Sequence, residues 1–480
     1  MPSQSTKSMS PIRRGFIVVW KQFCHLVVKT FYSKFEVTGS AYIPKDQGII
    51  FCVNHVNALI DAVVLQASTT KNVRPLARSG LFNNPVLKPI LNMIGAVPIY
   101  RRKTEKTDTS GNLDTFAKCY ELLAQNETLV IFPEGQSHSD SYVHDLKTGV
   151  ARMALGAIEA NSVEPVVIPV GLTFVRKRAA RTEVLVHYGS PIDLKTSKGM
   201  DDYEASHLVT DRVKAGIESV TLNAPSWQDI DLVTRLEGFF SMRHGKRRTS
   251  TLKQRFQSLQ RIIEAQHLLN EYEPDKVRTL MSKLRLFERL CKACGINNYH
   301  LGIKYKPVLL VLYTLRTLGI VLIGFPVAIW GILNSYIPYK ITTWLTQKVS
   351  KDTDQHDTAQ VLIGMGFFGL FWALQSYYIF QTFGLTWLII YVISILIGAA
   401  VALSLRGEYR RTLENLKVFF LFVRKKDLKS YLETKRHDLE IELAQMVRIA
   451  KRLSKSQEGD ELEYKSTKNE GVDSRNPPSC

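Results

Sequence analysis

The segment GIIFCVNHVNALID, residues 48–61, decides the fold, because it places a titratable side chain between two regular elements. Residues 49–53 are apolar and β-rich and follow a glycine, a pattern that predicts a buried strand. From Asp61 to Ala67 the chain continues without a helix breaker, which predicts a helix. His55 therefore lies where a strand ends and a helix begins, a common position for functional side chains.

His55 and Asp61 have the side chains of a general base and of the acid that supports it. Histidine exchanges a proton near neutral pH, since its unperturbed pKa is about 6.5, and a carboxylate on the other ring nitrogen fixes its tautomer. The two side chains can meet if the residues between them form a turn rather than regular helix. The alternative is a surface histidine near an N-cap asparagine, with Asp61 as a first-turn acid that the helix dipole favours.

Strands and helices alternate from Phe35 to about Ile192. Apolar, β-rich runs predict strands at 35–39, 49–53, 97–100, 128–132, 166–174 and 184–188. Helical spacing of apolar residues predicts helices at 61–67, 114–124 and 148–159. Alternation of this kind predicts an α/β domain in which helices flank a mostly buried sheet.

Two further stretches carry residues suited to substrate binding. In GAVPIYRRK, residues 95–103, three cations follow a predicted strand, and guanidinium groups grip phosphate in a planar fork. A solvated basic loop is the alternative. In FPEGQSHS, residues 132–139, Pro133 fixes the chain direction after a strand and Gly135 allows a ligand to approach the backbone closely. The sequence GQSHS nearly matches the nucleophile elbow of serine hydrolases but lacks its final glycine.

Four motifs occur in the order and spacing of one enzyme family. They are NHx5D at 54–61, Gx5R at 95–101, FPEG at 132–135 and VIPVGL at 167–172. The chain therefore resembles the glycerol-phosphate acyltransferase superfamily, and the resemblance covers most of its length. The commonest family pattern has four residues between His and Asp, where this chain has five, and continues FPEG with Thr-Arg-Ser rather than Gln-Ser-His. Both differences, with LKTGVA at 146–151, are similar to the yeast-type branch that acylates glycerol 3-phosphate and dihydroxyacetone phosphate.

The resemblance implies a fold and a base. The fold is an α/β acyltransferase domain with a mixed sheet flanked by helices, followed by a helical linker and a C-terminal α-helical membrane region. His55 would remove the proton from the substrate hydroxyl as that hydroxyl attacks a thioester, and Asp61 would orient His55. The implied co-substrate is acyl-CoA, and the resemblance implies no cofactor and no metal.

The resemblance also implies which residues bind the acceptor. Arg101 is the first candidate for the substrate phosphate, because it stands six residues after Gly95, where the family motif places its arginine. The weaker candidates are Arg102, Lys147 and His138. Glu134 and Gly135 would shape the glycerol side of the pocket.

The charge of the chain calls for an anionic partner. The formal net charge is +19 and the pI is about 9.5. Residues 241–306 hold 15 Lys and Arg against 5 Asp and Glu, and residues 406–455 hold 14 against 7. These two stretches bracket the only long hydrophobic region, a pattern typical of basic juxtamembrane segments facing anionic lipid. No nucleic-acid recognition signature accompanies them, so anionic membrane lipid is the expected partner and nucleic acid is not.

Six cysteines in a chain of 480 residues predict no disulfide framework and suggest a reducing compartment. Cys291 and Cys294 form a single CxxC with no second pair, so a zinc site is not expected.

These patterns divide the chain into six parts. Residues 1–34 are expected to form an amphipathic helix lying in a membrane interface, or alternatively a helix packed on a soluble core. The remaining parts are an acyltransferase domain at 35–222, a basic helical linker at 223–306, a membrane region at 307–405, a basic helical segment at 406–455 and a disordered tail at 456–480.

The membrane region supports at least two crossings. Residues 361–405 contain no charge across 45 positions, and a break near Gly384 leaves spans of about 361–382 and 385–405. The apolar segment 308–333 is either re-entrant or spanning. Both basic stretches are expected to face the cytoplasm, which requires an even number of crossings between them. The prediction is an integral membrane protein with its catalytic domain on the cytoplasmic face, in the endoplasmic reticulum if eukaryotic or the plasma (inner) membrane if bacterial.

Three functions remain open from the sequence. The first is transfer of a fatty acyl group from acyl-CoA to the sn-1 hydroxyl of glycerol 3-phosphate or dihydroxyacetone phosphate, which the resemblance implies as the first step of phospholipid and triacylglycerol synthesis. The second is acylation of the sn-2 hydroxyl of lysophosphatidate. The third is a non-catalytic, lipid-binding membrane scaffold.

Overall fold

The computed structural model describes residues 10–85, 87–100, 111–175, 182–196, 200–243, 251–296, 298–301, 307–349 and 356–473. The chain forms two compact units. The first comprises Met1–Trp227 and Pro338–Gly369, and the second comprises Gln228–Ile337 and Leu370–Cys480. Each unit has its own apolar core.

The first unit is built on a seven-stranded sheet. Its strands are β1 (Lys34–Thr38), β2 (Ile49–Val53), β3 (Val73–Arg78), β4 (Val97–Ile99), β5 (Thr128–Ile131), β6 (Val166–Phe174) and β7 (Glu183–Tyr188). They lie in the order β1-β7-β6-β2-β5-β3-β4, and every neighbouring pair is parallel except β6 with β7. The structure thus confirms the mixed α/β sheet. It brings the carboxyl ends of β2, β4 and β5 to the same edge, where the motif residues follow.

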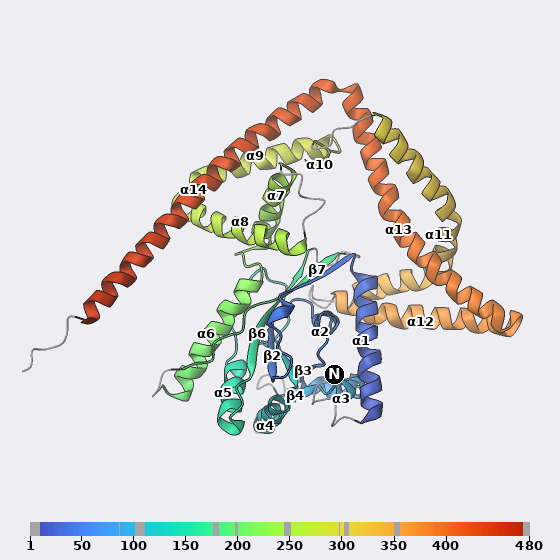
Figure 1. Ribbon diagram of the computed structural model, residues 1–480. Helices are drawn as coiled ribbons and strands as arrows, with labels where there is room; N and C mark the ends of the chain where they lie inside the picture. The colour runs from blue at the N-terminus through green and yellow to red at the C-terminus, as the bar shows by residue number, and fades with distance from the viewer. Residues whose placement is uncertain are drawn as a thin grey trace, which may run out of the picture. The chain divides into compact units, whose positions relative to one another are not determined.

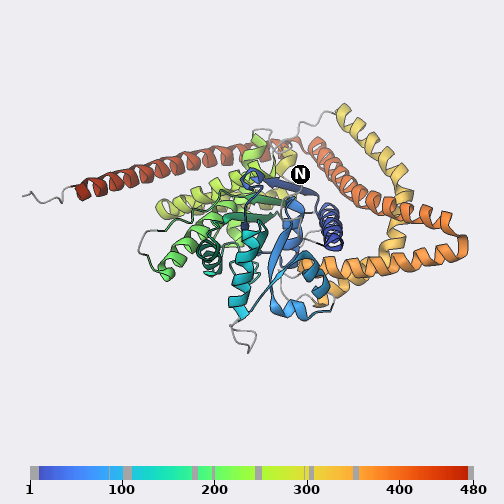
Figure 2. The ribbon, with the colours of Figure 1, turned by 60° about the horizontal axis from the view of Figure 1, so that its bottom comes forward.

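Helices cover both faces of this sheet (Figures 1 and 2). On one face lie α4 (Gly111–Ala124), α5 (Gly149–Asn161) and α6 (Asp202–Val220), and on the other lie α1 (Pro11–Phe31) and α2 (Leu59–Ser68). The side chains of β2 alternate between the faces, with Ile50 and Cys52 in the first core and Ile49, Phe51 and Val53 in the second. All five residues are buried, which explains their continuous apolar character.

Helix α1 has two apolar faces. Ile17, Cys24 and Val28 are buried in the core on the α1–α2 face of the sheet, so the helix packs on a protein core. A separate stripe of Ile12, Val19 and Leu26 is 65–80% exposed. The stripe is available for the interfacial contact expected from the sequence, while the opposite face matches the alternative of core packing.

Two elements of the first unit escape the sequence patterns, β3 and α3 (Leu87–Ile94). β3 contains Pro75 and the buried Arg74, neither typical of an inner strand. Arg74 is tolerated because its guanidinium makes two bonds, of 3.0 and 2.7 Å, to the buried carboxylate of Glu127. Short 3-10 turns occupy Ser40–Tyr42 and Ser79–Asn83.

The second unit is helical. Its core joins residues of α7 (Trp227–Arg243), α8 (Leu252–Tyr272), α9 (Pro274–Ala293), α10 (Asn298–Leu301) and α14 (Lys426–Asp473). Helix α14 continues to Asp473, past residue 456, where the composition predicts the start of a disordered tail. The segment is rich in Glu and Lys, which are good helix formers.

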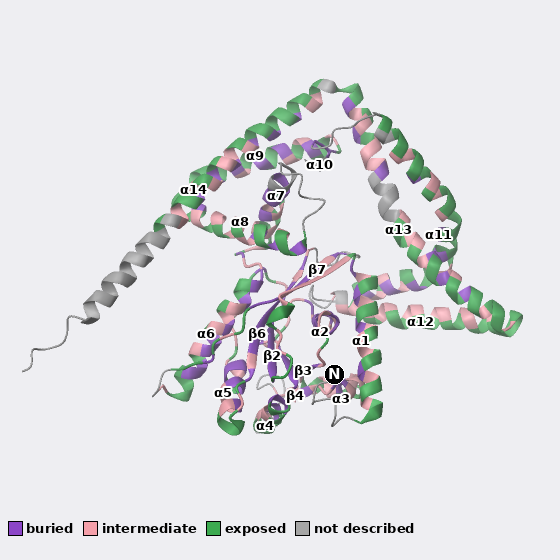
Figure 3. Ribbon diagram, in the orientation of Figure 1, coloured by how far each residue is buried: buried purple, intermediate pink, exposed green. Residues whose placement is uncertain are grey.

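Three helices with long apolar stretches lie between α10 and α14 in the chain: α11 (Pro307–Val349), α12 (His356–Phe383) and α13 (Leu385–Arg424). Among the described residues, three helical segments are long and apolar enough to cross a membrane: Val311–Val349, Thr358–Phe383 and Leu385–Leu405. Much of their surface is exposed (Figure 3), and many of the exposed residues are large and apolar. Helix α11 extends well past Leu333, where the sequence suggested that the apolar segment ends.

Helices α11 and α13 cross through small residues. A Cβ atom added to Gly331 would collide with the backbone of Gly398, so the two backbones touch at this point. Next to the crossing, the indole N–H of Trp330 donates to Ser394 Oγ at 3.0 Å. The hydroxyl of Tyr391 donates to Asn334 Oδ1, also at 3.0 Å. Polar bonds of this kind hold apolar helices together where the surroundings offer no other partner.

Candidate active site

His55 and Asp61 meet at the edge of the sheet. His55 Nδ1 lies 2.9 Å from Asp61 Oδ2, and the same oxygen accepts the amides of Val56 at 2.9 Å and Asn57 at 2.8 Å. The residues between β2 and α2 therefore wrap around the carboxylate as a turn, and Ala58 closes that turn with φ +46°. This confirms that the two side chains meet across the five-residue spacing.

The contact with Asp61 determines which ring nitrogen of His55 is available. A carboxylate only accepts hydrogen bonds, so Nδ1 carries the proton and Nε2 keeps its lone pair. Among the described residues, Nε2 has no hydrogen-bond partner, and the side chain is 19% exposed while that of Asp61 is fully buried. The ring stacks on Phe132, with centroids 4.1 Å apart and planes at 23°. The ring is thus oriented from two sides, by Asp61 and by Phe132, while the side chain stays partly exposed.

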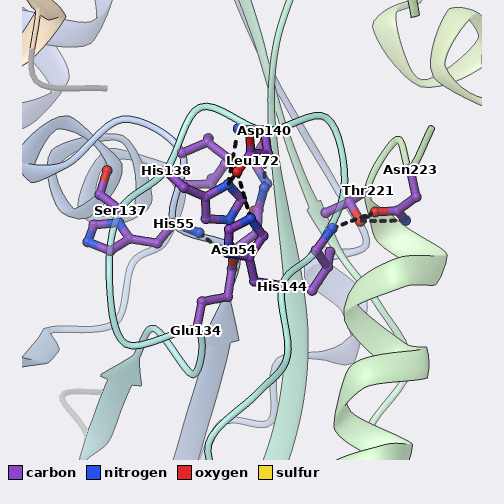
Figure 4. Close-up of polar contacts among 12 residues, drawn as sticks. Asn54, His55, Glu134, Ser137, His138, Asp140, His144, Leu172, Thr221 and Asn223 are labelled. Atoms are coloured by element: carbon purple, nitrogen blue, oxygen red, sulfur yellow. Dashed lines mark hydrogen bonds and ion pairs between the residues drawn. The ribbon is translucent and has the colours of Figure 1, made fainter. Parts of the chain in front are cut away.

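Glu134 and His138 hold the backbone of His55 (Figure 4). The amide of His55 donates to Glu134 Oε1 at 3.0 Å, and the amide of His138 donates to the carbonyl of His55 at 3.1 Å. The second carboxylate oxygen of Glu134 contacts Nε2 of His138. Both side chains are buried. In this structure both residues bond the backbone of His55, and their predicted place beside the substrate stays a prediction.

His138, Asp140 and His144 form a cluster of groups that can ligate metals. Their donor atoms are already engaged with one another. His138 Nδ1 accepts the amide of Asp140 at 3.2 Å, and Asp140 Oδ2 lies 2.7 Å from His144 Nε2. The two imidazole rings stack at 3.8 Å with only 8° between their planes. Their in-plane lone pairs therefore run in nearly parallel planes and do not converge on one ion.

Lys147 places a cation beside the FPEG turn. Gly135 has φ +75°, and a Cβ atom added there would lie 2.9 Å from Lys147 Nζ, so the ammonium group rests on the glycine backbone. The amide of Lys147 donates to the carbonyl of Pro133 at 2.9 Å, which ties the two segments together. The residue is exposed, and no carboxylate of the described chain lies within ion-pair distance of it. Lys147 is therefore suited to an anionic ligand.

Arg101 and Arg102 lie outside the described residues. Tyr100, which precedes them, follows β4, and Asn112 brackets its backbone with bonds of 3.1 Å to the amide and 3.0 Å to the carbonyl. β4 is three strand positions from β2 in the sheet, a separation of roughly 14 Å at about 4.8 Å per strand. Tyr100, the last described residue before the two arginines, follows β4 at the same edge of the sheet as His55.

Two polar residues that the sequence analysis did not single out complete the site. Asn54 Nδ2 donates to the carbonyl of Leu172 at 3.2 Å, and the amide of Leu172 donates to Asn54 Oδ1 at 2.7 Å. These two bonds continue the pairing of β2 with β6 past the end of β2. Ser137 Oγ accepts the amide of Ala58 at 3.2 Å. An asparagine directly after a buried strand is a recognisable signal, whereas Ser137 contacts a residue 79 positions away and leaves no local one.

The fold and the site define a class of protein. A carboxylate-supported histidine at the carboxyl edge of parallel strands, whose Nε2 has no hydrogen-bond partner in the described part of the chain, is chemically able to accept a proton from a bound group. Residues 34–173 match the family model described as Acyltransferase, and this part of the chain is an acyltransferase-family domain. The matched segment contains six of the seven strands and the whole His55 site.

Several known proteins are similar to this segment. Glycerol-3-phosphate O-acyltransferases 1 and 2 of Saccharomyces cerevisiae are 27% and 32% identical over 132 and 135 residues. These alignments cover 26% and 27% of this chain but only 17% and 18% of the yeast proteins. The chloroplastic 1-acyl-sn-glycerol-3-phosphate acyltransferase LPAT1 of Arabidopsis thaliana is 27% identical over 146 residues, 30% of this chain and 39% of the relative. The crystal structure of the 1-acyl-sn-glycerophosphate acyltransferase of Thermotoga maritima aligns with a TM-score of 0.32 and 21% identity, over 43% of this chain and 81% of that one.

Proposed function

We propose that this chain transfers a fatty acyl group from acyl-CoA to the sn-1 hydroxyl of glycerol 3-phosphate, of dihydroxyacetone phosphate, or of both. The observation that carries the proposal is the His55–Asp61 pair inside an acyltransferase-family domain, with its 2.9 Å contact and an Nε2 that no described residue bonds. The names of the two yeast relatives support glycerol 3-phosphate as the acceptor.

The geometry of the site supports the following reaction. His55 Nε2 takes the proton of the acceptor hydroxyl while the hydroxyl oxygen forms a bond to the thioester carbonyl carbon. The carbon–sulfur bond then breaks and the ester is released. The leaving thiolate of coenzyme A accepts the proton from the imidazolium of His55, which returns the base to its starting form. Asp61 stabilises the imidazolium and keeps the ring in place. A positioned base of this kind contributes about 10²- to 10⁴-fold in rate.

The acceptor phosphate needs a cation near the base. Lys147 supplies one beside Gly135, and Arg101 is the second group that we assign to the phosphate, from its place in the Gx5R motif. Glu134 has both carboxylate oxygens committed to His55 and His138, so we assign it to support of the base and not to the glycerol hydroxyls. Gly135 remains the point of close backbone approach.

The membrane helices give the reaction its location. Acyl-CoA and the acylated product carry apolar chains, so anchoring the domain at a bilayer shortens the route of both. The three apolar segments support an integral membrane protein, and the flanking basic stretches support a cytoplasmic face for the domain and contact with anionic lipid.

A second acceptor is favoured by a specific observation. The Arabidopsis relative is named a 1-acyl-sn-glycerol-3-phosphate acyltransferase, so lysophosphatidate and its sn-2 hydroxyl form the competing assignment. The full chain in purified membranes should be offered glycerol 3-phosphate, dihydroxyacetone phosphate and lysophosphatidate separately, each with radiolabelled acyl-CoA, beside the His55→Ala variant. Label in lysophosphatidate or its keto analogue supports the proposal. Label only in phosphatidate identifies the sn-2 enzyme, and no label with any acceptor favours a non-catalytic scaffold.

A further inference from the structure

The helix that follows the catalytic turn lacks a cap of its own. Helix α2 has Ala58 at its N-cap position, with no side-chain oxygen to accept a backbone N–H. The turn closes instead through weaker local bonds, such as the amide of Ile60 to the carbonyl of Asn57 at 3.2 Å. With Ala58 at φ +46°, a conformation that alanine rarely adopts, this turn needs support from elsewhere.

That support comes from the start of α12, about 300 residues along the chain and within the same compact unit. Thr358 Oγ1 donates to the carbonyl of Asn57 at 3.1 Å and accepts the amide of Ile60 at 3.4 Å. One hydroxyl thus bonds both ends of the turn. Both views of the ribbon place the first turn of α12 beside α2 (Figures 1 and 2).

An apolar contact accompanies the hydroxyl. Val361, three residues after Thr358, packs against the core on the α1–α2 face, which contains Ile60 and Val64 of α2. The start of α12 is therefore attached by a polar side chain to the turn before α2 and by an apolar side chain to this core, both on one helical face. Thr358 is also the first residue of a segment apolar enough to cross a membrane.

We infer that Thr358 is a positioning residue for catalysis, acting as a helix cap supplied from a distant segment; the inference rests on the proposed acyl transfer. The connection to the base is short. Thr358 holds the carbonyl of Asn57, the amide of Asn57 holds Asp61 Oδ2, and the same oxygen holds His55 Nδ1. The membrane helix α12 thereby becomes part of the catalytic apparatus, and the base is in its working position only when that helix is docked.

The test compares three variants of the full chain in membranes. Thr358→Val keeps the shape but removes the hydroxyl, and Thr358→Ser keeps the hydroxyl. The matched control is Thr382→Val near the other end of α12, where the exposed threonine donates only to the Tyr378 carbonyl at 2.9 Å. We expect kcat to fall about tenfold in Thr358→Val with both KM values unchanged, since small displacements of a catalytic group cost up to about 10²-fold. Thr358→Ser and Thr382→Val should match the wild type.

A second readout does not depend on activity. Hydrogen–deuterium exchange of the segment 56–62 in the membrane-embedded chain should be faster in Thr358→Val than in the wild type, in Thr358→Ser and in Thr382→Val. Faster exchange without any acyl transfer by the wild type would support the cap while rejecting the proposed function. Unchanged exchange and unchanged kcat in Thr358→Val would overturn the inference. Equal losses in Thr358→Ser and Thr358→Val would overturn the role of the hydroxyl.

Discussion

The backbone amide of His55 donates a hydrogen bond of 3.0 Å to Oε1 of Glu134, which lies 79 residues further along the chain. The bond joins the end of β2 to the end of β5, two parallel neighbours in the sheet. Because the buried carboxylate of Glu134 accepts a hydrogen bond from the backbone of His55, it fixes the position of the His55 backbone. Asp61 separately fixes the orientation of the imidazole ring.

Glu134→Gln should lower kcat and leave the KM for the phosphorylated acceptor unchanged. The amide oxygen can still accept from the His55 amide, but the variant loses a carboxylate oxygen facing His138, and a buried charge-assisted bond of this kind contributes about 1.5–3 kcal/mol. Steady-state kinetics with the acceptor varied at saturating acyl-CoA checks this. A selective rise in the acceptor KM would instead return Glu134 to the glycerol side of the pocket.

Asp61→Asn should reduce kcat by about 10²- to 10⁴-fold, because an amide can present its N–H to the ring and favour the wrong tautomer of His55. Initial rates should be compared with those of His55→Ala, which we expect to be inactive. Both proteins should remain in the membrane fraction, since neither residue belongs to the three segments that are long and apolar enough to cross a membrane. Substantial turnover by His55→Ala would remove the proposed base.

Lys147→Ala should raise the KM for glycerol 3-phosphate by about tenfold or more and leave that for acyl-CoA unchanged, because the bond between a cation and a phosphate contributes about 1.5–3 kcal/mol. Lys147→Arg is the matched variant and should retain most of the affinity. Arg101→Ala belongs in the same assay. Equal effects of the alanine variants on both substrates would argue against a phosphate site.

Glu127→Gln should destabilise the protein by about 3–5 kcal/mol, because it leaves the buried guanidinium of Arg74 without its counter-charge. Thermal unfolding of the detergent-solubilised chain, followed by intrinsic fluorescence, measures the loss as a lower transition temperature. Glu121→Gln on α4 is the control, since its ion pair with Lys118 is exposed. An unchanged transition in Glu127→Gln would mean that water compensates Arg74.

Thiol reactivity should report the docking of α1. Burial raises the pKa of Cys24 and of Cys119 to about 12 and raises the pKa of Cys52 further. Only the thiolate reacts, so at pH 8 roughly one thiol in 10⁴ is reactive at each of the first two sites. Iodoacetamide and peptide mass spectrometry should find these three cysteines unmodified in the native chain and modified in urea. The partly exposed Cys294 should react in both. Rapid native labelling of Cys24 alone would mean that α1 leaves its core.

Local patterns predicted the part of the fold that holds the base, because β2 is buried on both faces and α2 follows without a breaker. They missed β3, because its Arg74 suits an inner strand only when Glu127 neutralises it, and Pro75 is untypical of such a strand. The meeting of His55 with Asp61 could be anticipated, since it depends on residues close in sequence. The bonds from Glu134 and His138 to the backbone of His55 could not be predicted, because a sequence motif does not tell whether its side chains face a ligand or the protein.

Among the described residues, β1 has one partner strand, β7, and Ser33 beside it bonds Thr182, 149 residues away. During synthesis, β1 therefore cannot join the sheet until β7 has been made. Until Tyr188 has been synthesised, β1 has no partner strand among the described residues, and α1 is held by its packing against the core that contains α2. We expect the exposed apolar stripe of α1 to bind a bilayer surface during that interval.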